Sequence, residues 1–140
     1  MASEQDANKQ VVRDFIAALG RGDAVAMAPL LAPDVEAIAT GTSFMSGTRD
    51  RDTILSTLGT LGAITMNGID FEILSMTAEE DRVSAEAKGH STLVNGMPYD
   101  NEYHMLFTLK DGRIVRIREY FCTKLTEDAF GPLLAQQQQA

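Results

Sequence analysis

The sequence is poor in the residues that build metal centres and cross-linked scaffolds. Its 140 residues include one cysteine, Cys122, and two histidines, His90 and His104. A single cysteine excludes an internal disulfide and a cysteine-built zinc site. The histidines have no carboxylate at ligand spacing, and no glycine-rich loop follows a predicted strand. We therefore expect no metal and no other cofactor.

Basic charge and long apolar runs are also scarce. Lysine and arginine number 12 against 20 aspartates and glutamates, so the net charge is -8. An acidic excess repels phosphate backbones and anionic lipids, so we expect neither a nucleic-acid partner nor a membrane partner. The opening MASEQDANKQ lacks the apolar segment of a secretory signal, and no run is long enough to span a membrane. A cytoplasmic location is the expectation.

The composition that remains is that of a globular domain. Hydrophobic residues make up 44% of the chain and charged residues 23%, which argues against disorder. The length fits one domain, which we expect over residues 1–132. Residues 133–140 end in QQQQA and are expected to form a disordered polar tail.

The first part of the chain has helical periodicity. Apolar residues over 11–19 form one stripe at helical spacing, and Gly20 and Gly22 end that helix. A second, short helix is expected over 25–31, a short strand over 35–39, and a third helix over 54–61.

After Gly62 the pattern changes to long alternating runs. Strands are expected over 65–77, 83–94, 97–109 and 113–122. Asn95-Gly96 and Asp111-Gly112 are tight-turn signals between consecutive strands. One more helical turn is expected over 126–130, ended by Gly131-Pro132.

Helices followed by hairpin-linked strands predict an α+β fold with an antiparallel sheet. The expected strands are longer than the usual five or six residues or so, and long strands must twist and coil. A strongly curved sheet wrapped on helices encloses a conical pocket, and such a pocket can hold a small molecule. The other face of the sheet is left for solvent or for a partner subunit.

Three stretches resemble the nuclear transport factor 2-like superfamily, in particular its SnoaL-like and ketosteroid-isomerase-like small proteins. They read GRGDAVAMAPLLAPDVEA, FMSGTRDRDTILSTL and NGMPYDNEYHMLFTLKDGRIVRIREYF. The resemblance covers residues 8–131 and implies a cone with a deep pocket, together with a homodimer through the outer face of the sheet. The superfamily hosts isomerases, polyketide cyclases, epoxide hydrolases, dehydratases and binding proteins, so the resemblance leaves the activity open.

The resemblance also shows which family residues are absent. The oxyanion tyrosine of ketosteroid isomerases corresponds to Phe15 and their catalytic aspartate to Ala39, while Tyr103 stands at their second oxyanion donor. Proton abstraction next to a carbonyl needs a positioned base, so the standard steroid isomerisation is not expected.

Most catalytic residues of limonene-type epoxide hydrolases are absent as well. One of their aspartates matches Glu119, but their arginine and second aspartate fall near Lys88 and His90. Their water-holding tyrosine and asparagine correspond to Ala37 and Ala39. Only one carboxylate of that set survives.

Strand alternation sorts the remaining candidates by face. Asn101, Tyr103 and Met105 share a face that the resemblance places in the cavity, where Tyr103 and Asn101 would orient a carbonyl or hydroxyl oxygen. The alternative for the polar pair is a hydrogen-bonded place in the core. Lys88 and His90 share one face of the preceding strand, which faces either the cavity or solvent.

Glu119 is the leading functional candidate. It lies between Ile117 and Phe121 on an apolar strand face, where burial would raise its pKa and suit it to acid–base chemistry. The alternative is an internal ion pair. His90 is the best second acid or base, because histidine exchanges protons near neutral pH, and it would form a pair with Glu119 if their side chains meet. The alternative for His90 is a surface histidine.

The sequence therefore predicts an enzyme that needs no cofactor and acts on a small hydrophobic oxygenated molecule by general acid–base chemistry. Isomerase, cyclase, hydratase or dehydratase, and epoxide-hydrolase reactions all stay open. The expected catalytic residues are Glu119, His90 and Tyr103, and the expected substrate-binding residues are Asn101, Phe15, Lys88, Met105, Ile117, Phe121 and Leu58. The alternative is a non-catalytic ligand-binding or dimerising module. In either case His104, on the outer face, is expected in the dimer interface.

Overall fold

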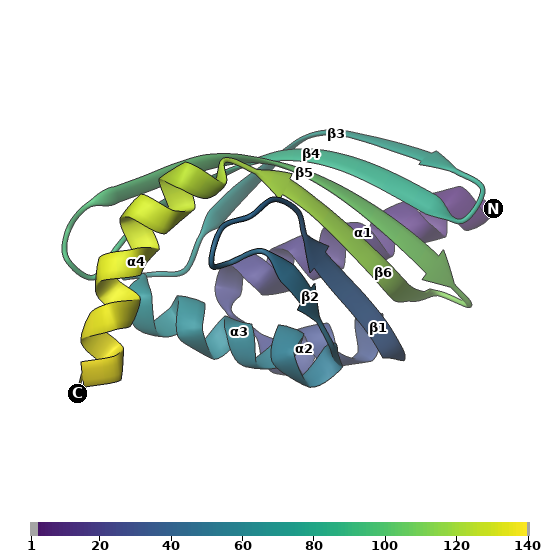
Figure 1. Ribbon diagram of the computed structural model, residues 1–140. Coiled ribbons are helices and arrows are strands. Elements are labelled where there is room, and N and C mark those ends of the chain that lie inside the picture. The colour runs from purple at the N-terminus through teal and green to yellow at the C-terminus, as the bar shows by residue number, and fades with distance from the viewer. Residues whose placement is uncertain (1–2, 140) are drawn as a thin grey trace.

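The computed structural model describes residues 3–139 and has an α+β architecture, as predicted (Figure 1). The helical segments are α1 (Glu4–Arg21), α2 (Ala24–Met27), the 3-10 turn η1 (Ala28–Leu30), α3 (Arg51–Ile64) and α4 (Thr123–Gln139). The strands are β1 (Leu31–Ala39), β2 (Gly47–Arg49), β3 (Asp70–Glu79), β4 (Arg82–Thr92), β5 (Pro98–Lys110) and β6 (Arg113–Phe121).

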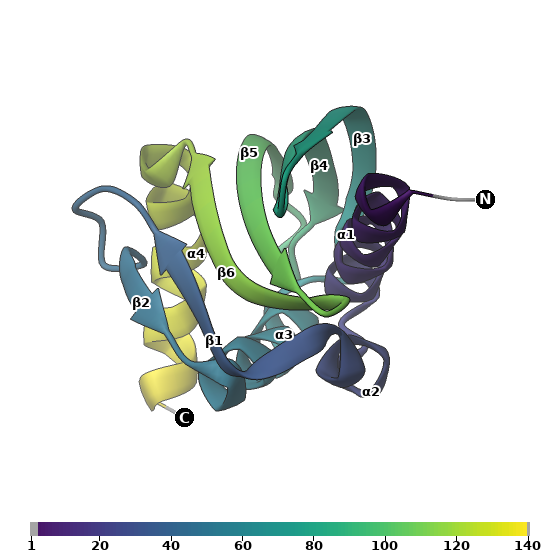
Figure 2. The same ribbon diagram turned by 90° about the vertical axis from the view of Figure 1, so that its right-hand side faces the viewer.

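The strands form one sheet in the order β2-β1-β6-β5-β4-β3. Its long strands curl around α1 and α3, which lie on the concave side (Figure 2). The sheet is mixed, which corrects the prediction of a wholly antiparallel one. β1 runs parallel to β6, with Ala37 opposite Ile117 and Ala39 opposite Glu119. The long stretch of chain between these two strands allows the parallel pairing, because a parallel pair needs a crossover rather than a tight turn.

Local signals set the ends of α1. The helix begins earlier than its apolar stripe, at Glu4, because Ser3 and Asp6 form a capping box at its N-terminus. Gly22 ends it in the left-handed conformation, with φ of 67°. The stripe buries Val12, Phe15 and Ile16 against the concave face of the sheet.

The turns predicted between the long strands are present. Gly96 has φ of 84° at the β4–β5 turn, and Asp111 and Gly112 both have positive φ at the β5–β6 turn. The register between β5 and β6 shifts near Thr108. As a result Ile114, and not its neighbour Val115, is buried in the core.

The C-terminal segment differs from the prediction. α4 continues through Pro132 to Gln139, so neither the helix end at Gly131-Pro132 nor the disordered tail from residue 133 is found, and Ala140 lies outside the described residues. Burial of two large side chains, Phe130 and Leu133, explains the continuation. It contributes roughly 1.5–3 kcal/mol for each, enough to offset a proline cost of about 3 kcal/mol.

The apolar residues form two clusters. The larger fills the space between the concave face and α1, α2 and α3. The smaller joins α4 to α3 and the β4–β5 turn, and consists of Ile64, Leu93, Tyr99, Phe130 and Leu133. Within residues 3–139, no helix is long and apolar enough to cross a membrane.

Candidate functional site

An apolar pocket lies between the concave face of the sheet and the helices. Its volume is about 130 Å³, and its wall combines residues of α1, α3, α4 and five strands, β1, β2, β3, β5 and β6. Most wall residues are aliphatic or aromatic. The polar ones are Arg49, Thr57, Tyr99, Tyr103, Glu119 and Thr126. A small number of polar groups in an apolar concave wall is typical of a ligand site.

Glu119 supplies the only carboxylate in the described wall of this pocket. Alternation along β6 turns Ile117, Glu119 and Phe121 toward the cavity, as the sequence predicted. The half-buried Glu119 stands opposite Ala39, whose small side chain leaves space beside the carboxylate. Burial raises the pKa of Glu119, and the positive charge of Arg49 partly opposes that rise. An acid of this kind keeps its proton to a higher pH than an exposed glutamate does.

Arg49 is a wall residue that the sequence analysis missed. β2 pairs with β1 so that Arg49 lies opposite Ala37, and a guanidinium nitrogen of Arg49 donates a hydrogen bond to the Met45 carbonyl at 2.6 Å. No ion pair joins Arg49 to Glu119 among the described residues. Because β2 has only three residues, it offers no alternation from which the direction of Arg49 could be predicted. The only signal was its place in the FMSGTRDRD stretch.

Tyr103 lies in the pocket wall and belongs to a chain of buried hydroxyl groups. Its hydroxyl donates to the Tyr99 hydroxyl at 3.1 Å, and the Tyr99 oxygen lies 2.7 Å from Thr126 Oγ1 of α4. Burial raises the pKa of Tyr103, and the neighbouring Tyr99 and Glu119 add to that rise. Tyr103 therefore stays protonated under all ordinary conditions.

Asn101 is placed in the core, which was the alternative left open for it. Its Nδ2 donates to the Tyr99 hydroxyl and Thr126 Oγ1, both at 3.0 Å, and to the Cys122 carbonyl at 3.2 Å. Its Oδ1 accepts from the Glu102 amide at 2.8 Å. The side chain is 6% exposed and does not line the pocket, so the expected contact with substrate is replaced by support of the hydroxyl chain.

His90 and Lys88 face outward, which corrects the expected pair of His90 with Glu119. His90 Nδ1 lies 2.9 Å from Asp100 Oδ1, and both side chains are more than half exposed. Lys88 stands between Glu72 and Glu102 of the neighbouring strands.

The inward face of β4 instead carries small residues, including Ala85, Ala87 and Gly89. A Cβ atom at Gly89 would lie 3.0 Å from both Tyr103 Cε2 and Ile69 Cγ2. The small residues therefore make room for the aromatic rings of the pocket, and the polar residues between them are turned outward.

Most of the expected apolar contacts lie in the pocket. Phe15, Met105, Ile117 and Phe121 line it. Leu58 does not, since it is buried in the larger cluster. On α3, Thr57 and Leu61 line the cavity instead, because they lie one turn apart on the same helix face while Leu58 is rotated away.

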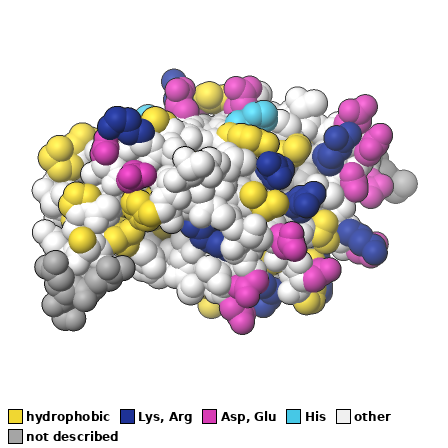
Figure 3. All heavy atoms as spheres, in the orientation of Figure 1, with side chains coloured by type: hydrophobic (Ala, Val, Ile, Leu, Met, Phe, Trp, Pro, Cys, Tyr) yellow, Lys and Arg dark blue, Asp and Glu magenta, His cyan; other side chains and the backbone are white. Residues whose placement is uncertain are grey.

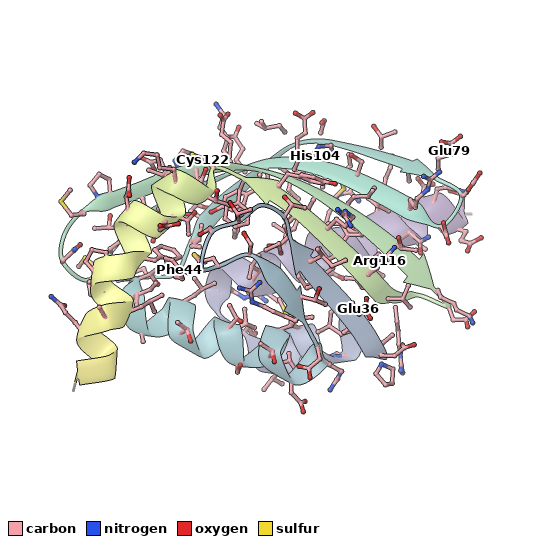
Figure 4. The ribbon with its side chains drawn as sticks, viewed as in Figure 1. Glu36, Phe44, Glu79, His104, Arg116 and Cys122 are labelled. Atoms are coloured by element: carbon pink, nitrogen blue, oxygen red, sulfur yellow. The ribbon has the colours of Figure 1, made fainter. Side chains whose placement is uncertain are left out.

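The β1–β2 loop and α4 lie together in one part of the pocket wall. Met45 of this loop lines the pocket, and Ser43 donates a hydrogen bond to Glu127 of α4 at 2.9 Å. Phe44 lies beside α4 (Figure 4), where a Cβ atom at Gly131 would be 4.0 Å from its ring. Within residues 3–139, no group of three or more histidine, cysteine, aspartate or glutamate side chains is arranged to hold a metal ion.

The chain matches a family of known proteins over most of its length. A family model described as "SnoaL-like domain" matches residues 12–117. An uncharacterised protein of Mycobacterium tuberculosis is 30% identical over 129 residues, which cover 89% of this chain and 96% of that relative.

Solved structures share the fold at lower identity. Bal32a, from a soil-derived mobile gene cassette, has a TM-score of 0.79 and 23% identity over 91% of this chain and 98% of its own. PrhC from Penicillium brasilianum has a TM-score of 0.84 and 20% identity over 96% of this chain and 93% of its own. A protein of Jannaschia sp. CCS1 described as a SnoaL-like polyketide cyclase has a TM-score of 0.76 and 15% identity, over 92% and 94%.

Proposed function

Because the chain belongs to the SnoaL-like domain family and encloses a carboxyl group in an apolar pocket, we propose that it is an enzyme of general acid–base chemistry. The substrate is a small, mostly hydrophobic molecule that carries oxygen. The observation that supports this proposal most is the position of Glu119, whose pKa is raised by burial beside the cavity. Perturbed acids in clefts are concentrated at functional sites.

The pocket favours reactions in which one group both takes and returns a proton. In its ionised form Glu119 removes a proton from the substrate, and in its protonated form it delivers that proton to another atom. Arg49 is placed to stabilise negative charge on a substrate oxygen near the carboxylate. Isomerisation, cyclisation and the loss or addition of water need no second carboxylate, so we place them ahead of epoxide opening.

The second candidate is a non-catalytic binding module of the same fold. It is supported by the outward position of His90, which leaves Glu119 without the partner acid or base that the sequence predicted. Phe15 and Ala39, which replace the catalytic groups of ketosteroid isomerases, line the same cavity and add apolar surface. Such a module would bind the same small molecules without turnover.

A base-catalysed ring opening separates the two candidates without knowledge of the natural substrate. In 1,2-benzisoxazole a base removes the C3 proton, the N–O bond breaks, and 2-hydroxybenzonitrile forms, so no other reactant is needed. We expect the protein to accelerate this reaction, with a rate that rises with pH through an ionisation above the ordinary glutamate range. A rate no faster than that in buffer would favour the binding module.

We also propose that two copies associate through the outer face of the sheet. Glu72 and Glu102 lie toward the α4 end of the outer face and Glu86 lies near its middle, so that acidic residues outnumber Lys88 there. Toward the other end, Arg82, Arg116 and Arg118 outnumber the neighbouring Glu36 and Glu79. Figure 3 shows basic side chains beside hydrophobic ones over this part of the molecule. A two-fold axis through the sheet would set the acidic end of one copy against the basic end of the other.

Charge reversal tests the dimer. We expect a dimer in analytical ultracentrifugation and a monomer for the double variant Arg116→Glu with Arg118→Glu, whose two acidic ends would repel. Combining it with Glu86→Arg and Glu102→Arg should restore association. A monomeric wild type, or a double variant that stays dimeric, would contradict the proposed interface.

A further inference from the structure

The hydroxyl groups in the pocket wall have a fixed donor direction. The chain ends at the Cys122 carbonyl, which can only accept, and Thr126 Oγ1 donates to it at 3.3 Å. Since Thr126 has one hydroxyl proton, the short 2.7 Å bond to Tyr99 has Tyr99 as its donor. Tyr99 therefore accepts from Tyr103 at 3.1 Å, and the proton of Tyr103 is used in this bond and is not offered to a ligand.

The fourth hydroxyl group in the wall, that of Thr57, also donates its hydrogen bond to the protein. Thr57 donates to the Thr53 carbonyl of its own helix at 2.8 Å. All four hydroxyl-bearing wall residues (Thr57, Tyr99, Tyr103 and Thr126) thus donate to other protein atoms. Asn101 reinforces this pattern, because it donates to both the Tyr99 and the Thr126 oxygens. What Tyr103 and Thr57 offer to a ligand is lone pairs.

Donors in the wall come from a different group of residues. Arg49 is the permanent donor, and Glu119 becomes one when it is protonated. Tyr103, Glu119 and Arg49 all line this pocket. Tyr103 and Glu119 stand on the paired strands β5 and β6, and Arg49 stands on β2, which pairs with β1 next to β6. A ligand oxygen in this region meets a donor on one side and an acceptor, Tyr103, on the other. A hydroxyl group satisfies both, whereas a carbonyl oxygen satisfies only the donor.

The size of the cavity limits the ligand. A volume of about 130 Å³ is close to that of an engineered cavity of about 150 Å³ that binds benzene. A molecule with one six-membered ring, either alone or fused to a small second ring as in 1,2-benzisoxazole, therefore matches the pocket in size.

We propose that the pocket selects a single-ring molecule by its hydroxyl group, with Tyr103 as the hydrogen-bond acceptor and with Tyr99 and Thr126 as the positioning residues that fix this direction. The proposal rests on the proposed function only in taking the pocket as the small-molecule site. It adds the substrate class, a cyclic alcohol, phenol or stable enol rather than a ketone.

Cyclohexanol and cyclohexanone are matched probes for this selection, because they share ring and oxygen but only the alcohol donates. We expect wild type to bind the alcohol about three- to tenfold more tightly in an NMR titration, the ratio that one neutral hydrogen bond provides. In Tyr99→Phe the Tyr103 proton loses its acceptor and turns to the pocket, so the ratio should fall to one or below. Thr126→Val acts on the same chain and should lower the ratio too.

Two further variants keep the comparison sharp. Tyr120→Phe changes an exposed tyrosine of the outer face and should leave the ratio unchanged. Tyr103→Phe removes the acceptor itself and should bring the ratio of the two affinities to about one. This variant tests the proposal if neither Tyr99→Phe nor Thr126→Val folds.

A wild type that binds the ketone as tightly as the alcohol overturns the proposal, as does a folded Tyr99→Phe or Tyr103→Phe with the wild-type ratio. If neither cyclohexanol nor cyclohexanone binds, both this proposal and the assignment of the pocket as the small-molecule site are wrong. If the preference for the alcohol is found but the protein does not accelerate benzisoxazole opening, the proposed catalysis is wrong and the selection by a hydroxyl group stands.

Discussion

The two faces of the curved sheet are built from the same strands and have different roles. On β5, Tyr99, Met105 and Phe107 point inward and are buried, while Glu102 and His104, between them in sequence, are exposed. On the inner face, each polar group either lines the cavity or is hydrogen-bonded beneath it. On the outer face, polar groups such as His90 and Asp100 lie beside each other in solvent. The histidine that looked best suited for catalysis lies outside, and the carboxylate lies inside.

This contrast shows that environment, more than residue type, decides which group is available for chemistry. His90 and Asp100 are close together, but water surrounds both, so neither is held against an apolar ligand. Glu119 has no close ion-pair partner among the described residues, and burial raises its pKa even though the charge of Arg49 opposes that rise. Substitutions on the inner face should therefore have large effects, and matched substitutions on the outer face small ones.

The largest effect is expected from the core beneath the pocket. Phe107 is fully buried and packs edge-on against Phe15, with ring centroids 5.4 Å apart. Phe107→Ala should lower the free energy of unfolding by about 3–5 kcal/mol in a denaturant titration. The outer-face control Thr77→Ala should change it by no more than about 0.5 kcal/mol. Equal losses in the two variants would mean that the faces are not distinguished by burial.

The next effect concerns the carboxylate. Glu119→Gln keeps the shape of the side chain but cannot accept a proton, so the rate of benzisoxazole opening should fall by about 100-fold or more. Glu102→Gln makes the same chemical change on the outer face and should keep the wild-type rate. A Glu119→Gln protein that is folded and retains full activity would remove this residue from the proposed mechanism.

Stability should depend on pH through Glu119. The pKa of this group is higher in the folded chain than its ordinary value of 4.5. Between the two values the folded state binds more protons than the unfolded state, so the free energy of unfolding falls as pH rises through that range. Thermal melts at a series of pH values should show this fall in wild type. Glu119→Gln should reduce it and should melt higher than wild type at neutral pH; parallel curves would contradict the assignment.

The smallest effect is expected for the histidine of the outer face. His90→Ala removes an exposed contact with Asp100 and leaves the pocket untouched, so the benzisoxazole rate should stay within about twofold of wild type. A loss comparable to that of Glu119→Gln would show that His90 takes part in the reaction despite its position.

The alternation of inward and outward side chains along the strands accounts for most of the predictions that were confirmed. It placed Ile117, Glu119 and Phe121 on one face because β6 is regular where it borders the pocket. Alternation could not orient β4. It separates the small Ala87 and Gly89 from the longer, polar Lys88 and His90, and either set could face the cavity. The need for space around Tyr103 decides in favour of the small residues.

Three other features depend on contacts that no local pattern records. Arg49 lies on a strand too short for alternation. Asn101 is satisfied by groups more than twenty residues away, in Cys122 and Thr126. The length of α4 depends on the burial of Phe130 and Leu133 in a cluster that exists only once Tyr99 and Leu93 are in place.

The ionisation of Glu119 tests the central claim most directly. In a carboxyl ¹³C NMR titration of the wild type, one glutamate signal that is missing from the Glu119→Gln spectrum should titrate clearly above the range of the other glutamates. If that signal instead titrates together with the exposed glutamates, Glu119 is in contact with bulk water, and the proposed acid–base site does not exist.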